Sequence, residues 1–422
     1  MTRRLDGIVQ RRLSAVIRRR MSVSPVVVLA GPRAVGKSVL LRELGDRFDV
    51  PVLDLDDLDS RSMVSRDPGH FVAGPDPVLV DEFQHVPQVL DAIKAELNRA
   101  TRPGRFVITG STRYDMLPRS AQALTGRASV VPVLPLSQGE QDGMAETFLA
   151  TLLSEPGSLL DRTAGVTRRE EYVDRVLSGG YPLPLMLPEE ARSRWFEDYV
   201  SLVLERDVVA ISRVRQRDQL PRLLYRLAAQ TGQVLNVAEA ARSVAVETTS
   251  AENYARLLES VFLIHRLPAW GTTLGSKVGA SPKLHVVDSG LGAHLLRLSP
   301  EKLSRRIPQA LTEFGHLLET FVTGELLKQV GWLDPPVTVG HWRTRDGVEA
   351  DLVLERRDGG VAAIEVKAAS RVDASDGRAL AALAARTGER WLGGVVLYLG
   401  THGAQLDEGR RIIALPVDAL WR

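Results

Sequence analysis

Residues 26–44 read VVVLAGPRAVGKSVLLREL, and this stretch decides the fold of the N-terminal part of the chain. Its first five residues are apolar and predict a buried strand, and the apolar residues after Lys37 recur at helical spacing. The loop between them has the spacing G-x-x-x-x-G-K-S. Glycines at both ends allow a tight turn whose backbone N–H groups point at phosphate oxygens, and the following helix adds its positive end. The stretch therefore predicts a P-loop NTPase core.

The predicted phosphate loop contains eight consecutive residues: Gly31, Pro32, Arg33, Ala34, Val35, Gly36, Lys37 and Ser38. Lys37 is expected to reach the β- and γ-phosphates of ATP, and the Ser38 hydroxyl to ligate Mg²⁺. The alternative is an ordinary glycine-rich turn, but that turn would not need the strand before it and the helix after it. We therefore expect ATP and Mg²⁺ as cofactors.

A second predicted strand, in DPVLVDEFQHV, ends at two acidic residues, Asp81 and Glu82. Carboxylates at the end of a buried parallel strand lie beside the phosphate loop in folds of this class. Asp81 is expected to hold the Mg²⁺ shell, and Glu82 to polarise the attacking water. Acids often end strands, so the pair indicates catalysis only together with the phosphate loop.

Several stretches together resemble a family of prokaryotic AAA-type ATPases: GPRAVGKS, LVDEFQHV, VITGST, LTGR and LPLS. The family also carries a C-terminal domain of uncharacterised function. The resemblance implies that a polar residue after the strand in RFVITGST senses the γ-phosphate, with Ser111 favoured over Thr109; a hydroxyl-rich turn is the alternative. Arg127, before another apolar strand, is a candidate for stabilising transition-state charge in cis or from a neighbour, or for a structural ion pair.

Composition bounds the remaining possibilities. The chain has 422 residues, 54 basic and 52 acidic, a net charge of +2 and no cysteine. Disulfides, thiolate metal sites and a cysteine nucleophile are excluded, and a cytoplasmic location is expected. No apolar run approaches the ~20 residues of a membrane span, so no membrane contact is expected. Residues 11–20 predict an amphipathic helix with its arginines in solvent; a contact with DNA or an anionic membrane is the alternative.

The middle of the chain predicts two regions. Residues 141–215 are helix-rich and are expected to form a lid or linker, and the resemblance extends to a Gly-Tyr-Pro turn and to the pair Arg206 and Asp207. Residues 216–305 predict a winged helix, with Asn236 as a helix N-cap. The second helix of that pattern is acidic, which favours protein packing over DNA binding. Asp288 follows a further apolar strand, and N-capping of a helix is its simplest role.

Residues 306–422 predict an α/β domain of the restriction-endonuclease type. Glu319 lies on an amphipathic helix, Asp351 on a strand, and AAIEVKAAS places Glu365 and Lys367 two residues apart on the next strand. This order resembles the PD-(D/E)XK nuclease superfamily, which implies that Glu319, Asp351 and Glu365 hold Mg²⁺ and that Lys367 acts near the scissile phosphate. The alternative is an ion pair between Glu365 and Lys367 in an inactive domain.

The sequence thus predicts a multidomain α/β protein: an AAA-type core (1–140), a helical lid or linker (141–215), a winged helix (216–305) and a nuclease-like domain (306–422). One hypothesis is an ATP-hydrolysing switch with nuclease output on nucleic acid. The other is a nucleotide-dependent module whose C-terminal domain docks a protein partner. A homo-oligomer is compatible with either hypothesis.

Overall fold

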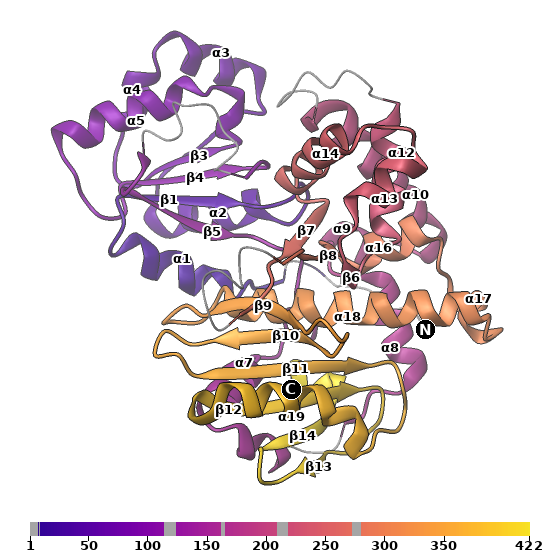
Figure 1. Cartoon of the computed structure of the whole chain (residues 1–422). Helices are drawn as coiled ribbons and strands as arrows, with labels where there is room; N and C mark the ends of the chain where they lie inside the picture. Colours follow the sequence, from indigo (N-terminus) through magenta and orange to yellow (C-terminus); the bar gives the residue numbers. More distant parts are fainter. Residues whose placement is uncertain (1–6, 8, 114–123, 162–164, 209–217, 272–279) are drawn as a thin grey trace.

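The computed structural model describes residues 7, 9–113, 124–161, 165–208, 218–271 and 280–422. The chain forms an N-terminal part built on a parallel sheet, a mainly helical middle part, and a C-terminal part built on a mixed sheet (Figure 1).

The N-terminal part contains a five-stranded parallel sheet with the order β2-β3-β4-β1-β5. Its strands are β1 (Val26–Ala30), β2 (Val52–Asp54), β3 (Val78–Asp81), β4 (Phe106–Gly110) and β5 (Ala128–Pro132). Its helices are α1 (Leu13–Met21), α2 (Lys37–Phe48), α3 (Leu58–Arg66), α4 (Pro68–Val72) and α5 (Gln88–Arg99). Helices α1 and α2 pack on one face of the sheet and α3 to α5 on the other, so the central strands are apolar on both sides.

Strand β1 lies between β4 and β5, and its last residue, Ala30, is level with Gly110 and Pro132. The segments that follow β1, β3 and β4 therefore leave the sheet at the same edge. This edge collects the predicted phosphate loop, Glu82 and Ser111, as the sequence analysis expected.

The middle part consists of helices around a small three-stranded sheet of order β6-β8-β7. Its elements are α6 (Gln138–Asp142), α7 (Phe148–Ser154), α8 (Arg169–Ser178), α9 (Pro182–Leu185), α10 (Glu189–Leu202), the π-helix Val203–Val208, α12 (Gln219–Ala228), β6 (Gln233–Val234), α13 (Val237–Ser243), α14 (Thr248–Ser260), β7 (Ile264–Leu267), β8 (Lys283–Val286), α16 (Ser289–Leu296) and α17 (Pro300–Ser304).

The expected lid over residues 141–215 is not a single structural unit. Phe148 and Leu152 of α7 and Tyr172 of α8 lie in the core of the C-terminal part. Phe196 of α10 and Val203 of the π-helix share a core with β1 and α2. Within the described residues of this region, it is the later segment, α10 and the π-helix, that reaches the phosphate loop.

Asp288 has a structural role that the structure makes plain. One carboxylate oxygen accepts the Leu291 N–H at 3.0 Å and caps α16, and the other accepts the Gly180 N–H at 2.7 Å. A Cβ at Gly179 would lie 2.2 Å from the same carboxylate, so only glycine fits there. Asp288 thus caps a helix, as expected, and also holds the Gly-Tyr-Pro turn against it.

The C-terminal part begins with the long helix α18 (Pro308–Val330), which packs on a six-stranded mixed sheet of order β13-β14-β12-β11-β10-β9. The strands are β9 (Thr338–Arg343), β10 (Glu349–Glu355), β11 (Val361–Lys367), β12 (Trp391–Tyr398), β13 (Ala404–Asp407) and β14 (Ile412–Pro416). Helix α19 (Arg378–Thr387) packs on the opposite face. Within the described residues, no helix combines the length and apolar character needed to cross a membrane.

The middle and C-terminal parts are joined by backbone contacts. Ala269 forms an isolated parallel β-bridge with His341 of β9, and His341 also shares a 3.1 Å hydrogen bond with the carbonyl oxygen of Ser281, just before β8. Helix α18 packs on both α16 and β11. The two parts are therefore held in a fixed relation at β8, β9 and α18.

Candidate functional site

The phosphate loop has the conformation that its glycines allow. Gly36 has φ +93°, which favours glycine, and it forms the N-cap of α2. A Cβ at Gly31 would lie 2.0 Å from the carbonyl oxygen of Val133, so a side chain there would collide with the segment after β5. The loop is therefore packed tightly against the sheet edge.

The Lys37 side chain turns back onto the backbone of its own loop. Its Nζ donates to the carbonyl oxygens of Gly31 at 3.0 Å and Pro32 at 2.8 Å, and it lies 3.9 Å from the Glu82 carboxylate. Burial lowers the pKa of Lys37, although Glu82 and Asp81 act in the opposite direction. The Lys37 ammonium thus has its hydrogen-bond partners in its own loop and lies beside the acidic pair after β3.

Thr109 fixes the two acidic residues after β3. Its hydroxyl donates to the Asp81 carboxylate, and its oxygen accepts the backbone N–H of Glu82 at 3.1 Å. Glu82 has φ +50°, a left-handed conformation that a glutamate adopts only where its surroundings hold it. Thr109, the second choice in the sequence analysis, therefore positions Asp81 and Glu82.

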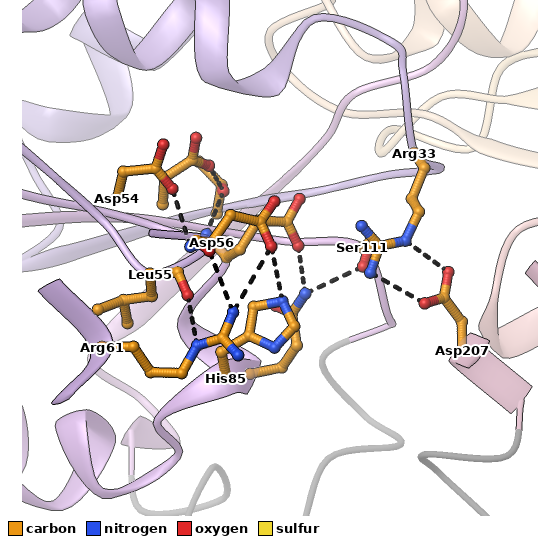
Figure 2. Close-up of polar contacts among 12 residues, drawn as sticks. Arg33, Asp54, Leu55, Asp56, Arg61, His85, Ser111 and Asp207 are labelled. Carbon is orange, nitrogen blue, oxygen red and sulfur yellow. Dashed lines mark hydrogen bonds and ion pairs between the residues drawn. The ribbon is translucent and has the colours of Figure 1, made fainter. Parts of the chain in front are cut away.

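Ser111 is connected to Glu82 through Gln84. The Gln84 amide donates to the Ser111 hydroxyl at 3.0 Å and also to the Glu82 carboxylate, as Figure 2 shows around the labelled Ser111. Gln84 follows directly after the acidic pair in DEFQHV. Gln84 was not predicted as a site residue, although its place two residues after Glu82 was a usable signal.

A second polar group continues this edge toward β2. His85 lies 3.0 Å from the Asp56 carboxylate, and Arg61 donates to the carbonyl oxygen of Leu55 at 2.9 Å (Figure 2). Asp54 at the end of β2 is in register with Asp81. These residues extend the polar edge of the sheet; His85 lies within the DEFQHV stretch, whereas no motif in the sequence pointed to Asp54, Asp56 or Arg61.

Arg33 of the phosphate loop is paired with Asp207 of the π-helix. The guanidinium donates two hydrogen bonds to the carboxylate, at 2.7 and 2.9 Å, and Figure 2 shows the two side chains facing each other. Burial lowers the pKa of Arg33, but Asp207, through its hydrogen bond and its charge, outweighs that effect, so the pKa is raised. The loop and the middle part are thus joined by a charged contact.

Arg11 corrects the expectation that the N-terminal arginines are solvated. Its guanidinium donates to the carbonyl oxygens of Val35 at 2.7 Å and Leu134 at 2.8 Å and to the Glu140 carboxylate at 3.0 Å. Arg11 is buried, and its contact with the Val35 carbonyl supports the phosphate loop from the protein interior.

Arg127 does not lie at the nucleotide edge. Its carbonyl oxygen accepts the N–H of Val26, the first residue of β1, and its side chain donates to Asn98 at 2.8 Å. It therefore lies one strand length, roughly 16 Å at ~3.3 Å per residue, from the phosphate loop. Action in cis is incompatible with this geometry; action from a neighbouring copy stays a prediction.

The C-terminal carboxylates converge around a lysine of the middle part. Lys283 of β8 places its ammonium 2.7 Å from Glu319 of α18 and 2.8 Å from Asp351 of β10. Only 1% of the Lys283 residue surface is exposed. Burial lowers the pKa of Lys283, but Asp351, Glu319 and Glu349 outweigh burial and raise it. Lys283 was not predicted as a site residue, since its sequence signal is limited to its position at the start of an apolar strand.

Glu365 and Lys367 complete this cluster. Leu352 pairs with Ile364, which places Asp351 opposite Glu365 at the next position of the two strands. Burial and then the charge of Asp351 raise the pKa of Glu365 to about 8, while Lys367 contacts it at 2.8 Å. The ion pair that the sequence analysis gave as an alternative is therefore present, within the cluster that it predicted.

The two predicted metal sites differ in how well they fit a divalent cation. At the phosphate loop, the Ser38 hydroxyl and the Asp81 carboxylate are oxygen donors of the kind that Mg²⁺ takes alongside phosphate oxygens. In the C-terminal cluster, the Lys283 ammonium lies between Glu319 and Asp351. No set of three or more acidic or histidine residues in the described part of the chain is arranged to hold a metal ion. The C-terminal cluster as it stands does not fit Mg²⁺.

Three segments of the chain match known domain families. Residues 23–141 match the AAA domain family, residues 169–302 match a domain of unknown function (DUF8612), and residues 314–420 match another (DUF4143). An uncharacterized protein of Mycobacterium tuberculosis (Rv2008c) is 26% identical over 400 residues, which cover 94% of this chain and 81% of the relative. An uncharacterized protein of Haemophilus influenzae is 23% identical over 288 residues, covering 66% of this chain and 63% of the relative.

Solved structures with similarity include the Walker-type ATPase PABY2304 of Pyrococcus abyssi, which is 16% identical with a TM-score of 0.42 and matches 70% of this chain and 98% of its own. The branch migration motor RuvB of Thermotoga maritima is 13% identical with a TM-score of 0.28, over 61% of this chain and 88% of its own. The family match and the phosphate-loop geometry lead to one conclusion: the chain contains an AAA-type P-loop ATPase domain at residues 23–141, followed by two domains whose families have no known function.

Proposed function

We propose that this chain is an Mg²⁺-dependent ATP hydrolase that works as a nucleotide-driven switch. In this proposal Lys37 binds the β- and γ-phosphates, Ser38 and Asp81 hold Mg²⁺, and Glu82 orients the attacking water. Ser111 reports the γ-phosphate through Gln84, which contacts both Ser111 and Glu82. Bound Mg²⁺ supplies charge stabilisation at the phosphates.

The ion pair between Arg33 and Asp207 is the observation that supports a nucleotide-driven switch. Arg33 belongs to the phosphate loop, so the charge in the loop changes beside its guanidinium when a polyphosphate binds. Asp207 belongs to the π-helix Val203–Val208, and single-turn π-helices are frequent at functional sites. Exchange of Asp207 for a phosphate oxygen as the partner of Arg33 would release the π-helix from the loop.

For the output of the switch, the described geometry favours docking over cleavage. The fold order of Glu319, Asp351, Glu365 and Lys367 supports a nuclease-like C-terminal domain, but the Lys283 ammonium lies where a catalytic cation would be needed. We therefore propose that this domain is a protein-interaction module. Cleavage of nucleic acid is the second candidate, and the convergence of these four side chains is the observation in its favour.

The middle part also favours docking of a protein over action on nucleic acid. We read the order α12, β6, α13, α14, β7, β8 as a winged helix, in which α14 would be the helix that contacts DNA. Glu252 and Glu259 of α14 are paired with Arg266, and the Ser260 carbonyl accepts the N–H of Arg113 after β4. The end of α14 is thus turned toward the ATPase domain, which suits packing against protein.

The test combines turnover, cleavage and exchange measurements on the full chain. Phosphate release should require both ATP and Mg²⁺, and single- and double-stranded DNA and RNA should stay intact with Mg²⁺ in the presence or absence of ATP. Hydrogen–deuterium exchange at residues 203–208 should rise when a non-hydrolysable ATP analogue binds. Absence of ATP turnover would refute the hydrolase, unchanged exchange would refute the switch, and Mg²⁺-dependent cleavage lost in Glu365→Ala would replace docking by nuclease activity.

A further inference from the structure

We infer that Lys283 takes the place of a divalent cation in the C-terminal carboxylate cluster, so that the cluster is a metal-free centre that locks the middle part to the C-terminal sheet. The inference goes beyond the proposed function, because it applies whether or not the chain hydrolyses ATP. In this inference, the cluster predicted to bind a metal ion instead binds the ammonium group of Lys283.

The distances are those of an ammonium bound to carboxylates. Lys283 Nζ donates a charge-assisted hydrogen bond to Asp351 Oδ1 at 2.8 Å and forms an ion pair with Glu319 Oε1 at 2.7 Å. The other Asp351 oxygen accepts the N–H of Val366 at 2.9 Å. The Asp351 carboxylate therefore already has a partner on each oxygen.

The backbone of Lys283 is part of the small three-stranded sheet. Lys283 starts β8, the central strand of the small sheet, and pairs with Val234 of β6 on one side and Leu267 of β7 on the other. Two residues earlier, the Ser281 carbonyl contacts His341 of the C-terminal sheet at 3.1 Å. Withdrawal of the ammonium would require either a new side-chain path through a buried junction or separation of the two sheets.

Charge explains why the ammonium and a metal exclude each other. Lys283 is shared by Glu319 and Asp351, and Lys367 contacts Glu365, so each of the three carboxylates has a cationic neighbour. A divalent ion among them would lie beside the Lys283 ammonium and be repelled. Without Lys283, two buried carboxylates would lack a cation, and Glu365 Oε2, which has no hydrogen-bond partner among the described residues, would add a third oxygen donor. Removal of Lys283 should therefore create a metal site.

The experiment is a titration of nucleotide-free full-length protein with MnCl₂, read by electron paramagnetic resonance of free Mn²⁺ and by thermal unfolding. We expect no Mn²⁺ site in the wild type that depends on Asp351. Lys283→Ala should melt roughly 5 °C or more below the wild type without metal, because it leaves buried charge unpaired. It should also gain one Mn²⁺ site with a Kd below about 1 mM and recover melting temperature with Mn²⁺.

Lys328→Ala is the matched control. Lys328 is a second lysine at the α18 interface, half-buried where Lys283 is fully buried, and its contacts are one carboxylate, Glu325 at 2.6 Å, and the Leu136 carbonyl at 3.0 Å. Its removal should create no Mn²⁺ site. A wild-type Mn²⁺ site that disappears in Asp351→Asn would overturn the inference, as would a Lys283→Ala protein that binds no Mn²⁺ and melts like the wild type.

A further variant covers the case in which Lys283→Ala does not fold. The triple substitution Lys283→Met, Glu319→Gln and Asp351→Asn removes the cation and the two buried charges in direct contact with it, and keeps the side-chain sizes; Glu349, 3.8 Å from Lys283, keeps its partner Arg343. If Lys283 acts as the counter-ion, this variant folds and melts above Lys283→Ala, and it binds no Mn²⁺. If the triple variant is as unstable as Lys283→Ala, charge balance is not the role of Lys283 and the inference fails.

Discussion

Lys37 contacts two carbonyl oxygens of its own loop, and exchange of these contacts for phosphate oxygens gives the first prediction. Lys37→Ala removes one charge-assisted contact, worth about 1.5–3 kcal/mol. This corresponds to a roughly ten- to hundredfold weaker affinity for ATP, measured by fluorescent nucleotide displacement. Lys94→Ala on the exposed side of α5 is the control and should bind ATP like the wild type. Unchanged ATP affinity and turnover in Lys37→Ala would contradict the role of the loop.

Glu82→Gln separates binding from hydrolysis. The amide keeps the size of the side chain but lacks the carboxylate that orients water, so ATP should bind and persist, with single-turnover hydrolysis slowed by about two orders of magnitude or more. Glu96→Gln, whose charge faces Arg99 on the surface of α5, controls for loss of a carboxylate. Normal turnover by Glu82→Gln would assign water activation to another acid.

These residues could be predicted from sequence because the motif places them within a few positions of a strand end. Spacing alone predicts that Lys37 lies in the loop after β1 and that Glu82 lies at the same sheet edge. Asp207 and Lys283 could not be predicted in this way. The Arg33–Asp207 contact spans 174 residues and the Lys283–Asp351 contact spans 68, so both depend on how separate elements dock. Docking is decided by three-dimensional packing, which has no local sequence period.

The π-helix Val203–Val208 is the element whose behaviour tests the switch most directly. Asp207→Asn keeps the side-chain size but loses the ion pair with Arg33. Both side chains are partly to mostly buried, and we expect exchange at residues 203–208 to rise about tenfold without nucleotide, equivalent to ~1.4 kcal/mol. The ATP-dependent rise in exchange should then disappear, because its cause has been removed.

Glu205→Gln provides the control within the same element. Glu205 is exposed and lies two residues before Asp207, so its neutralisation should leave both the basal exchange and the response to nucleotide as in the wild type. Equal effects of the two substitutions would show that general charge on the π-helix, and not the contact with Arg33, controls its opening.

At the scale of the elements, the parallel sheet and its two nucleotide-binding turns agree with the sequence prediction, because buried strands and glycine turns have strong local signals. The expected lid does not exist as one unit. Its helices are amphipathic and would fit any apolar face, and α7 and α8 pack on the C-terminal core. The amphipathic pattern predicts that a helix is half-buried, but it does not identify the element that covers it.

At the scale of the whole molecule, three histidines lie near the junction of the middle and C-terminal parts: His285 and His341 are buried, and His265, which pairs with His285 between β7 and β8, is half-buried. Burial lowers the pKa of His265 and His341 to about 4 and that of His285 well below its usual value. A lowered pKa in the folded state means that the stability present above the unfolded pKa of ~6.5 is lost as the pH falls. The junction should therefore open in acid.

His285→Gln tests this pH dependence. Between pH 7 and pH 5, protonation of the unfolded His285 alone should cost the wild-type junction about 2 kcal/mol, measured as the opening free energy of β8 by hydrogen exchange. In His285→Gln this share of the pH dependence should be absent, whereas His402→Gln at an exposed position should behave as the wild type. An identical pH dependence in all three proteins would exclude His285 as the cause.

Helix α18 has a mechanical consequence that follows from its length and its attachments. Near its C-terminal end, Glu325 accepts the N–H of Gln138 at 2.8 Å and Lys328 donates to the Leu136 carbonyl, so this end is fastened to the chain directly after the ATPase sheet. Its middle holds Lys283 through Glu319. A straight helix of 23 residues is a rod of ~34 Å. A tilt of about 5° at the ATPase end would move the far end by roughly 3 Å, so a small displacement at the nucleotide edge would be larger at the opposite end of this helix.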